Sequence, residues 1–167
     1  MIDADNGNIH LPNGFVITST LTLNEFRQSE FGRGAKSPNL SLQRSWLRLD
    51  AGTVETFPLE VSLRFEGQRL ACVFLDADLS RITRDDNSHW IDTKAFHDAL
   101  LRQDLGEPDA FTGTSDEDTP GLDKAPNHLR PWGKAVSEFD YGGGDAYISI
   151  EYDQQGAAAR TGQDDYD

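Results

Sequence analysis

The sequence contains a single cysteine among 167 residues, which excludes an internal disulfide bond. Cys72 lies in the apolar run of residues 70–75, where we expect a small, buried side chain. No apolar run approaches the roughly 20 residues that a membrane-spanning helix requires, and the first residues lack the cationic and apolar regions of a signal peptide. These absences predict a protein of the cytoplasm.

Basic residues are also few: the sequence contains 15 Lys and Arg and 29 Asp and Glu, which gives a formal net charge of −14. Such a surface repels phosphate groups, which argues against direct binding to nucleic acid or to an anionic membrane. Residues 85–167 hold 19 acids and 6 bases, whereas residues 1–84 hold 10 and 9. A one-sided excess of like charge indicates an interaction surface or a solvated segment.

Catalytic and cofactor-binding signatures are missing from the sequence. There is no nucleophile elbow, phosphate-binding loop or dinucleotide fingerprint, and the triple glycine at 142–144 lies between two expected strands. Residues 3–7 place a glycine after spaced carboxylates, but the spacing of a calcium-binding loop is not met. The four histidines are scattered and form no metal-binding pair. We therefore expect no enzymatic activity, no cofactor and no metal site.

Three Trp, nine Phe and four Tyr indicate a folded body, although the apolar content of 37% is low. A chain of this length fits one domain, which we place at residues 1–152, followed by a flexible acidic tail at residues 153–167. The expected fold is α+β, with a mainly antiparallel sheet of about five to six strands and two helices packed on it.

Local patterns locate most of these elements. Apolar and polar residues alternate over residues 59–66, and Glu66 and Gly67 then turn the chain into residues 69–75, which predicts a hairpin. Residues 69–75 are apolar on both faces, so we expect other elements to cover this strand on both sides. Further expected elements are a strand pair at 9–11 and 15–17, a helix that begins at the capping box of Thr22 and Glu25, a strand at 45–50, a helix from Asp92 to Leu105, and a hairpin at 132–141 and 146–152.

Two stretches, residues 33–42 and residues 104–131, lack periodicity and are expected to be irregular. The second begins with seven acids and no base between positions 104 and 123. It is either a solvated loop or an arm that docks on a basic partner, with nearby aromatic residues as anchors. The candidate partner-binding residues are Asp104, Glu107, Asp109, Asp116, Glu117, Asp118, Asp123 and Trp132.

A second hypothesis concerns the acids that follow residues 69–75. Asp76 and Asp78, together with His89, have the side chains that a divalent-metal enzyme needs. Asp85 and Asp86 lie nearby in the sequence, but the neighbouring Arg81 and Arg84 would neutralise such a site.

A small, acidic, single-domain chain with two strong hairpins and no catalytic signature resembles the bacterial immunity proteins of polymorphic toxin and contact-dependent inhibition systems. The resemblance implies a monomer that binds a cognate toxin domain with a basic surface, often a nuclease, and blocks its substrate cleft with acidic side chains. A third hypothesis, an adaptor or secretion chaperone, also uses an acidic surface and usually needs a dimer or a large apolar groove.

Overall fold

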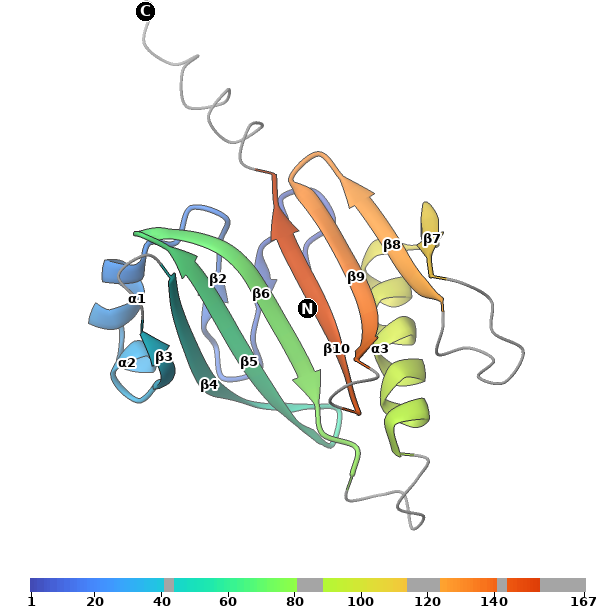
Figure 1. Ribbon diagram of the computed structural model, residues 1–167, viewed down its shortest axis with the longest axis horizontal. Coiled ribbons are helices and arrows are strands. Elements are labelled where there is room, and N and C mark those ends of the chain that lie inside the picture. The colour runs from blue at the N-terminus through green and yellow to red at the C-terminus, as the bar shows by residue number, and fades with distance from the viewer. Residues whose placement is uncertain (41–43, 81–88, 114–123, 141–143, 154–167) are drawn as a thin grey trace, which may run out of the picture.

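The computed structural model describes residues 1–40, 44–80, 89–113, 124–140 and 144–153. These residues form ten strands and three helices (Figure 1). In chain order the elements are β1 (Ile9–His10), β2 (Val16–Ile17), α1 (Leu23–Gln28), α2 (Glu30–Arg33), β3 (Lys36–Leu40), β4 (Arg44–Val54), β5 (Phe57–Glu66), β6 (Arg69–Ala77), α3 (His89–Leu105), β7 (Ala110–Thr112), β8 (Ala125–Arg130), β9 (Gly133–Asp140) and β10 (Asp145–Tyr152).

Eight of the strands make one antiparallel sheet in the order β3-β4-β5-β6-β10-β9-β8-β7, and β1 pairs with β2 separately. The expectation of a sheet of five to six strands with two helices is therefore wrong. The unexpected strands β3, β7 and β8 lie in the two stretches that were expected to be irregular. They contain Pro38 and Pro126 and lack strict alternation, and they lie at or next to the sheet edges, where proline is tolerated.

The locally encoded elements are confirmed. The hairpins β5–β6 and β9–β10 form, β4 pairs with β5, and β1 pairs with β2. Helix α1 begins at the predicted capping box, in which the Thr22 hydroxyl accepts from the Glu25 amide and the Glu25 carboxylate accepts from the Thr22 amide at 2.8 Å. Helix α3 begins at His89, earlier than the predicted start at Asp92.

One face of the sheet packs on the core. Because alternate side chains of a strand point to opposite faces, each central strand contributes every second residue to this face. Helix α3 lies against β8, β9 and β10, and in Figure 1 the blue N-terminal segment with β2 runs behind the other half of the sheet, with α1 at its left margin. The buried side chains of this face include Leu47, Leu49, Val61, Leu63, Val73, Leu75, Ile148 and Ile150, which join Ile9, Ile17 and Phe26 in one core.

The N-terminal loop is fixed to the far side of the sheet by Trp132. This side chain is only 5% exposed, its indole N–H donates to the Ala4 carbonyl oxygen at 2.9 Å, and its ring lies 6.1 Å from that of Tyr152. Gly7 has a φ of 72°, and a Cβ atom there would lie 2.5 Å from the Trp132 ring. The close approach of backbone and indole therefore requires glycine at position 7.

No helix within the described residues is long and apolar enough to span a membrane.

Candidate functional site: the open face of the sheet

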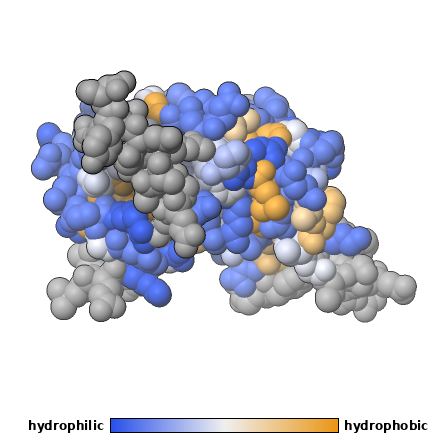
Figure 2. Space-filling model, turned by 90° about the horizontal axis from the view of Figure 1, so that it is seen from above, coloured by the Kyte–Doolittle hydropathy of each residue, from blue (hydrophilic) through white to orange (hydrophobic). Residues whose placement is uncertain are grey.

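The opposite face of the sheet carries the candidate site. This face is turned away from α3 and toward the viewer in Figure 1, and no helix of the described chain covers it. Figure 2 shows a hollow along the lower side of the view, which corresponds to this face. We define the open face by twenty residues on five strands: Arg44, Trp46, Arg48 and Asp50 (β4); Glu60, Ser62, Arg64 and Glu66 (β5); Arg69, Cys72, Phe74 and Asp76 (β6); Asp145, Tyr147, Ser149 and Glu151 (β10); and Lys134, Val136, Glu138 and Asp140 (β9).

Strand β6 was expected to be covered on both sides by other elements, but helices and the N-terminal segment cover only one. On the open face its apolar side chains are covered by neighbouring side chains instead. Cys72 is buried and free, as expected, and burial raises the pKa of its thiol to about 12. A thiol with such a pKa stays protonated and unreactive at neutral pH.

Three aromatic rings form a strip across the middle of the open face. The Trp46 and Phe74 rings stack with centroids 5.3 Å apart, and Tyr147 meets Phe74 edge to face at 5.6 Å. The guanidinium of Arg64 lies 5.9 Å from the centre of the Trp46 ring, which is a cation–π geometry. All three rings are half-buried, so the strip offers apolar and aromatic surface to a molecule lying on the sheet.

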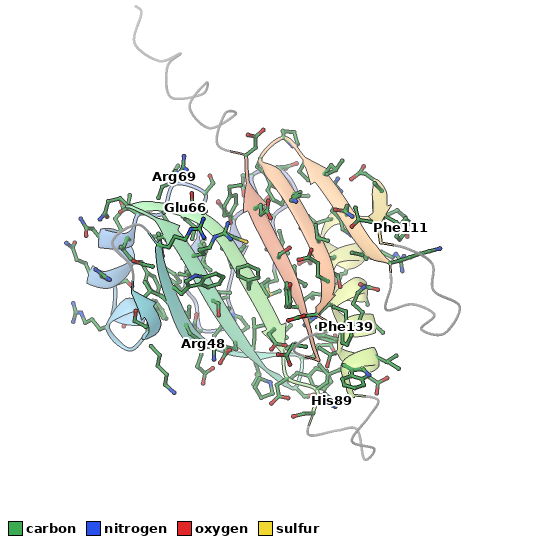
Figure 3. All side chains as sticks on the ribbon, in the orientation of Figure 1. Arg48, Glu66, Arg69, His89, Phe111 and Phe139 are labelled. Carbon is green, nitrogen blue, oxygen red and sulfur yellow. The ribbon has the colours of Figure 1, made fainter. Side chains whose placement is uncertain are left out.

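The open face is charged differently at its two ends. The strand register places Arg64 beside Trp46 and Cys72, and it places Glu66 opposite Arg69. Figure 3 shows Glu66 and Arg69 at the upper end of the sheet. We call this the basic end; its charged residues are Arg44, Arg64, Arg69 and Lys134, together with Glu66 and Glu151, which pair with Arg69 at 3.8 Å and with Lys134 at 3.3 Å.

The acidic end lies on the other side of the aromatic strip. Asp50 pairs in register with Glu60, Glu60 with Asp76, and Asp140 with Asp145. Arg48 reaches this end through its ion pair with Glu60, at 3.1 Å. The carboxylates of the acidic end are Asp50, Glu60, Asp76, Glu138, Asp140 and Asp145.

Asp76 is a carboxyl of the acidic end with a strongly raised pKa. Burial, and after it the carboxylates of Asp145, Glu60 and Asp78, together raise the pKa of Asp76 from 3.8 to about 6, and Arg48 acts in the opposite direction. A raised pKa means that the folded protein holds this negative charge at a free-energy cost.

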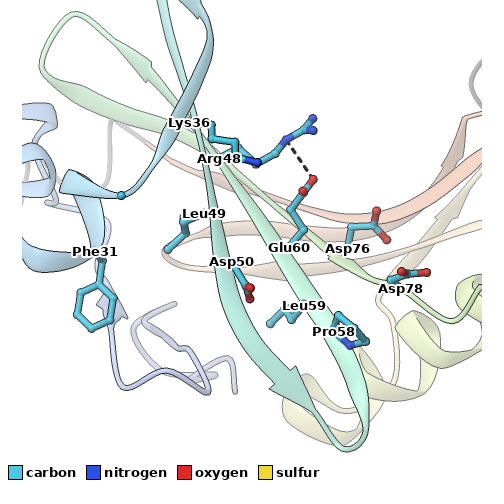
Figure 4. A pocket seen from close by; sticks show the side chains of 11 residues that line it. Phe31, Lys36, Arg48, Leu49, Asp50, Pro58, Leu59, Glu60, Asp76 and Asp78 are labelled. Carbon is cyan, nitrogen blue, oxygen red and sulfur yellow. Dashed lines mark ion pairs between the residues drawn. The ribbon is translucent and has the colours of Figure 1, made fainter. Parts of the chain in front are cut away.

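A cavity of about 640 Å³ opens from the acidic end around the edge of β4 (Figure 4). Glu60 and Asp76 are neighbours on β5 and β6 in this view, and Asp78 follows the end of β6. The charged residues that line the cavity are Lys36, Arg48, Asp50, Glu60, Asp76 and Asp78. The carboxylates outnumber the cations, so the cavity favours a positively charged occupant.

The three residues of the metal-enzyme hypothesis line one small cavity of about 180 Å³ at the start of α3. Asp76 and Asp78 come from the end of β6, and His89 is the first residue of α3. Asp78 accepts hydrogen bonds from the amide and the hydroxyl of Ser80. Within the described part of the chain, no group of three His, Cys, Asp or Glu side chains has the geometry to hold a metal ion. Arg81, Arg84, Asp85 and Asp86 lie outside the described residues.

Two of the predicted partner-binding residues make buried contacts inside the protein. The Asp104 carboxylate accepts from the Ile2 amide at 2.8 Å and pairs with the Met1 amino group at 3.0 Å. Trp132 holds the N-terminal loop, as described above. Neither side chain presents much surface to a partner.

Two others lie at the surface near the C-terminal end of α3. Glu107 pairs with Arg102 at 3.0 Å and is 77% exposed. Asp109 accepts from the Leu129 amide and pairs with Arg130, both at 2.8 Å, and the hydrogen bond from Leu129 is the main cause of its lowered pKa. These contacts hold the turn between α3 and β7 against the end of β8. The predicted binding residues Asp116, Glu117, Asp118 and Asp123 lie outside the described residues.

Apart from Asp76, which the metal-enzyme hypothesis named, the sequence analysis did not identify as site residues the side chains that the fold brings together on the open face. Their alternation was visible, because Glu60 and Arg64 lie on the polar side of β5 and Trp46 and Arg48 lie opposite Leu47 and Leu49. The pairing of β6 with β10, which joins Asp76 to Asp145, has no local signal.

Comparison with known proteins does not assign this chain to a family: no family model, curated protein or solved structure matches it.

Proposed function

We propose that this chain is a toxin-neutralising binding protein of the cytoplasm, which blocks a cognate protein toxin with a basic surface. The observation that carries the proposal is the open face, a broad sheet surface with three half-buried aromatic rings at its centre and a cluster of carboxylates at one end. The proposed binding surface is therefore the open face of the sheet, in place of the stretch at residues 104–123.

The chemistry of the open face supports protein binding. Aromatic side chains and arginine supply most of the free energy in typical protein interfaces, and Trp46, Tyr147 and Arg64 lie together here. The net charge of −14 accelerates the approach of a basic partner and disfavours acidic ones. A rigid antiparallel sheet holds these groups in place before binding, which limits the entropy lost on association.

The proposal is tested with the product of the adjacent reading frame, co-expressed with this chain. We expect the chain to restore growth to cells that express the toxin, and the purified proteins to bind with nanomolar or tighter affinity. Raising the salt concentration from about 50 to 300 mM should weaken the complex at least about tenfold, because screening removes long-range attraction.

A matched pair of variants locates the contact. Trp46→Ala removes an aromatic ring from the open face, whereas Phe111→Ala removes an exposed ring that packs on the α3 side of the molecule. We expect only Trp46→Ala to weaken the complex, by about tenfold or more. Equal affinities for both variants, with Trp46→Ala shown to be folded by circular dichroism, would contradict the use of the open face.

One observation favours a second candidate function. Asp76, Asp78 and His89 do line the same cavity, and a carboxyl with a pKa near 6 is suited to proton transfer. Calorimetric titration with Mg²⁺, Mn²⁺ and Zn²⁺ tests the hypothesis of a metal-dependent enzyme. Binding heat that is present in the wild type and absent in Asp78→Asn would support this hypothesis, and no binding heat in the wild type would exclude it.

A further inference from the structure

The open face changes from basic to acidic along its strands, and this charge gradient determines at which end a charged segment of a partner can bind. The basic end neutralises two of its carboxylates internally, through Arg69 with Glu66 and Lys134 with Glu151. The acidic end places Glu60 opposite both Asp50 and Asp76 and places Asp140 opposite Asp145, and among its described residues Arg48 pairs with Glu60. The local excess of negative charge is therefore concentrated at one end.

From this gradient and the adjoining aromatic strip, we propose that an arginine- or lysine-bearing segment of the partner protein docks across the acidic end of the open face and packs its aliphatic stems on Phe74 and Tyr147. The inference rests on the proposed function, since it names the part of the partner that the open face recognises.

The chemistry of the surface favours such a segment over other occupants. A cationic side chain carries an apolar stem and a charged head, so one residue can cover an aromatic ring and reach a carboxylate. The cavity of about 640 Å³ beside the strip is lined by Asp50, Glu60, Asp76 and Asp78 and can accommodate side chains of this size. Arg64 already lies against the Trp46 ring, which shows that a guanidinium fits against the strip.

The same charge gradient also determines how the partner is oriented on the open face. Arg44, Arg64 and Arg69 lie on the opposite side of the strip and repel a cation there. A basic segment is thereby confined to one half of the open face, where Glu138 of β9 lies opposite Tyr147 by register and Asp76 of β6 lies near Asp145 of β10. Recognition by this protein then depends on where its charges lie as well as on how many there are.

The test uses a fluorescein-labelled peptide of alternating arginine and serine as the probe, with the full chain at pH 8 and about 50 mM salt. Asp76→Asn with Asp145→Asn removes two of the six carboxylates of the acidic end. Glu66→Gln with Glu151→Gln neutralises two carboxylates at the basic end and gives the same net charge, so it serves as the matched control. We expect the first double variant to bind the probe at least about fivefold more weakly than the wild type, and the control to differ by less than about twofold.

Each alternative result would overturn the inference. Equal weakening by both double variants means that the probe responds only to net charge. Probe-induced amide shifts confined to the basic end, measured by NMR, place the segment elsewhere. A dimer in sedimentation that protects the Trp46 indole identifies a second copy of the chain as the occupant. If the cognate toxin binds the Asp76→Asn, Asp145→Asn variant as tightly as the wild type, this inference fails while the proposed function stands.

Discussion

Replacing Asp76 by asparagine should make the protein more stable at neutral pH. Burial and the carboxylates of Asp145, Glu60 and Asp78 raise the pKa of Asp76 from 3.8 to about 6, so the ionised side chain destabilises the fold whenever the pH lies above that range. Asparagine has nearly the same shape and no charge. The substitution therefore removes an unfavourable interaction without leaving a cavity.

The size of the effect follows from the two pKa values. A difference between 3.8 and about 6 corresponds to about 3 kcal/mol of destabilisation at pH 8. Asp76 is only partly buried, and solvent screening reduces this to about 1–2 kcal/mol. At pH 5 the folded state holds Asp76 mostly protonated while the unfolded state does not, so about half of the gain should remain. Below pH 3.8 both states are protonated and the gain should vanish.

The assay is urea unfolding of the wild type and of Asp76→Asn at pH 8 and pH 5, followed by tryptophan fluorescence. Glu66→Gln is the control, because Glu66 is a half-buried carboxylate of the same face in an ion pair with Arg69, and its neutralisation should not stabilise the protein. If Asp76→Asn is no more stable than the wild type at pH 8, or gains equally at pH 5 and pH 8, the electrostatic account of the acidic end is refuted. A gain in stability joined to a loss of probe binding would show that the charge is kept for recognition.

Three further predictions concern the framework that holds the open face. Gly7→Ala should destabilise the protein by about 2–4 kcal/mol in chemical unfolding, because the new Cβ atom would meet the Trp132 ring at 2.5 Å and the backbone φ is positive. The control is Gly14→Ala, which also has a positive φ but has open space around the new Cβ atom, and it should cost about 1 kcal/mol. Glu25→Ala should remove half of the capping box and cost about 0.5–1 kcal/mol, measured by thermal unfolding, whereas Glu30→Ala in α2 should cost less. The buried His97 accepts a hydrogen bond from the Ala77 amide at 3.0 Å, and burial lowers the pKa of His97 to about 3, so only the unfolded state gains a proton at this residue as the pH falls below 6.5. Between pH 7 and pH 5 the free energy of unfolding of the wild type should therefore fall by about 2 kcal/mol more than that of His97→Gln, which keeps a hydrogen-bond acceptor. Parallel pH profiles of the two proteins would contradict this prediction.

The hairpins were predictable because their information is local. In β5 the alternation of Leu59, Val61, Leu63 and Phe65 with polar residues identifies both the strand and its buried side, and Gly67 supplies the turn into β6. The same holds for the capping box of α1, where two side chains three residues apart satisfy the first backbone donors.

The missing strands were not predictable because their partners determine them. Strand β3 is Lys-Ser-Pro-Asn-Leu and β7 is Ala-Phe-Thr, and neither carries a periodic pattern. Each becomes a strand because a longer neighbour, β4 or β8, offers it an unpaired edge. Trp132 illustrates the same limit for the site: its position next to an acidic stretch favoured a partner contact, whereas its indole bonds to Ala4, at the other end of the chain.

The pairing of β6 with β10 has a consequence for the stage of synthesis at which the proposed binding surface is complete. The two halves of the sheet, β3 to β6 and β7 to β10, meet only along this pair, and β10 is the last strand of the sheet to leave the ribosome. The rings of Phe74 and Tyr147 meet only when β10 pairs with β6, so a chain interrupted before Asp145 would contain every element of the first half and still lack a complete proposed binding surface. The proposed binding surface is therefore incomplete until β10 has been synthesised, and two separately expressed fragments divided between β6 and α3 would complete it only by pairing along the same seam.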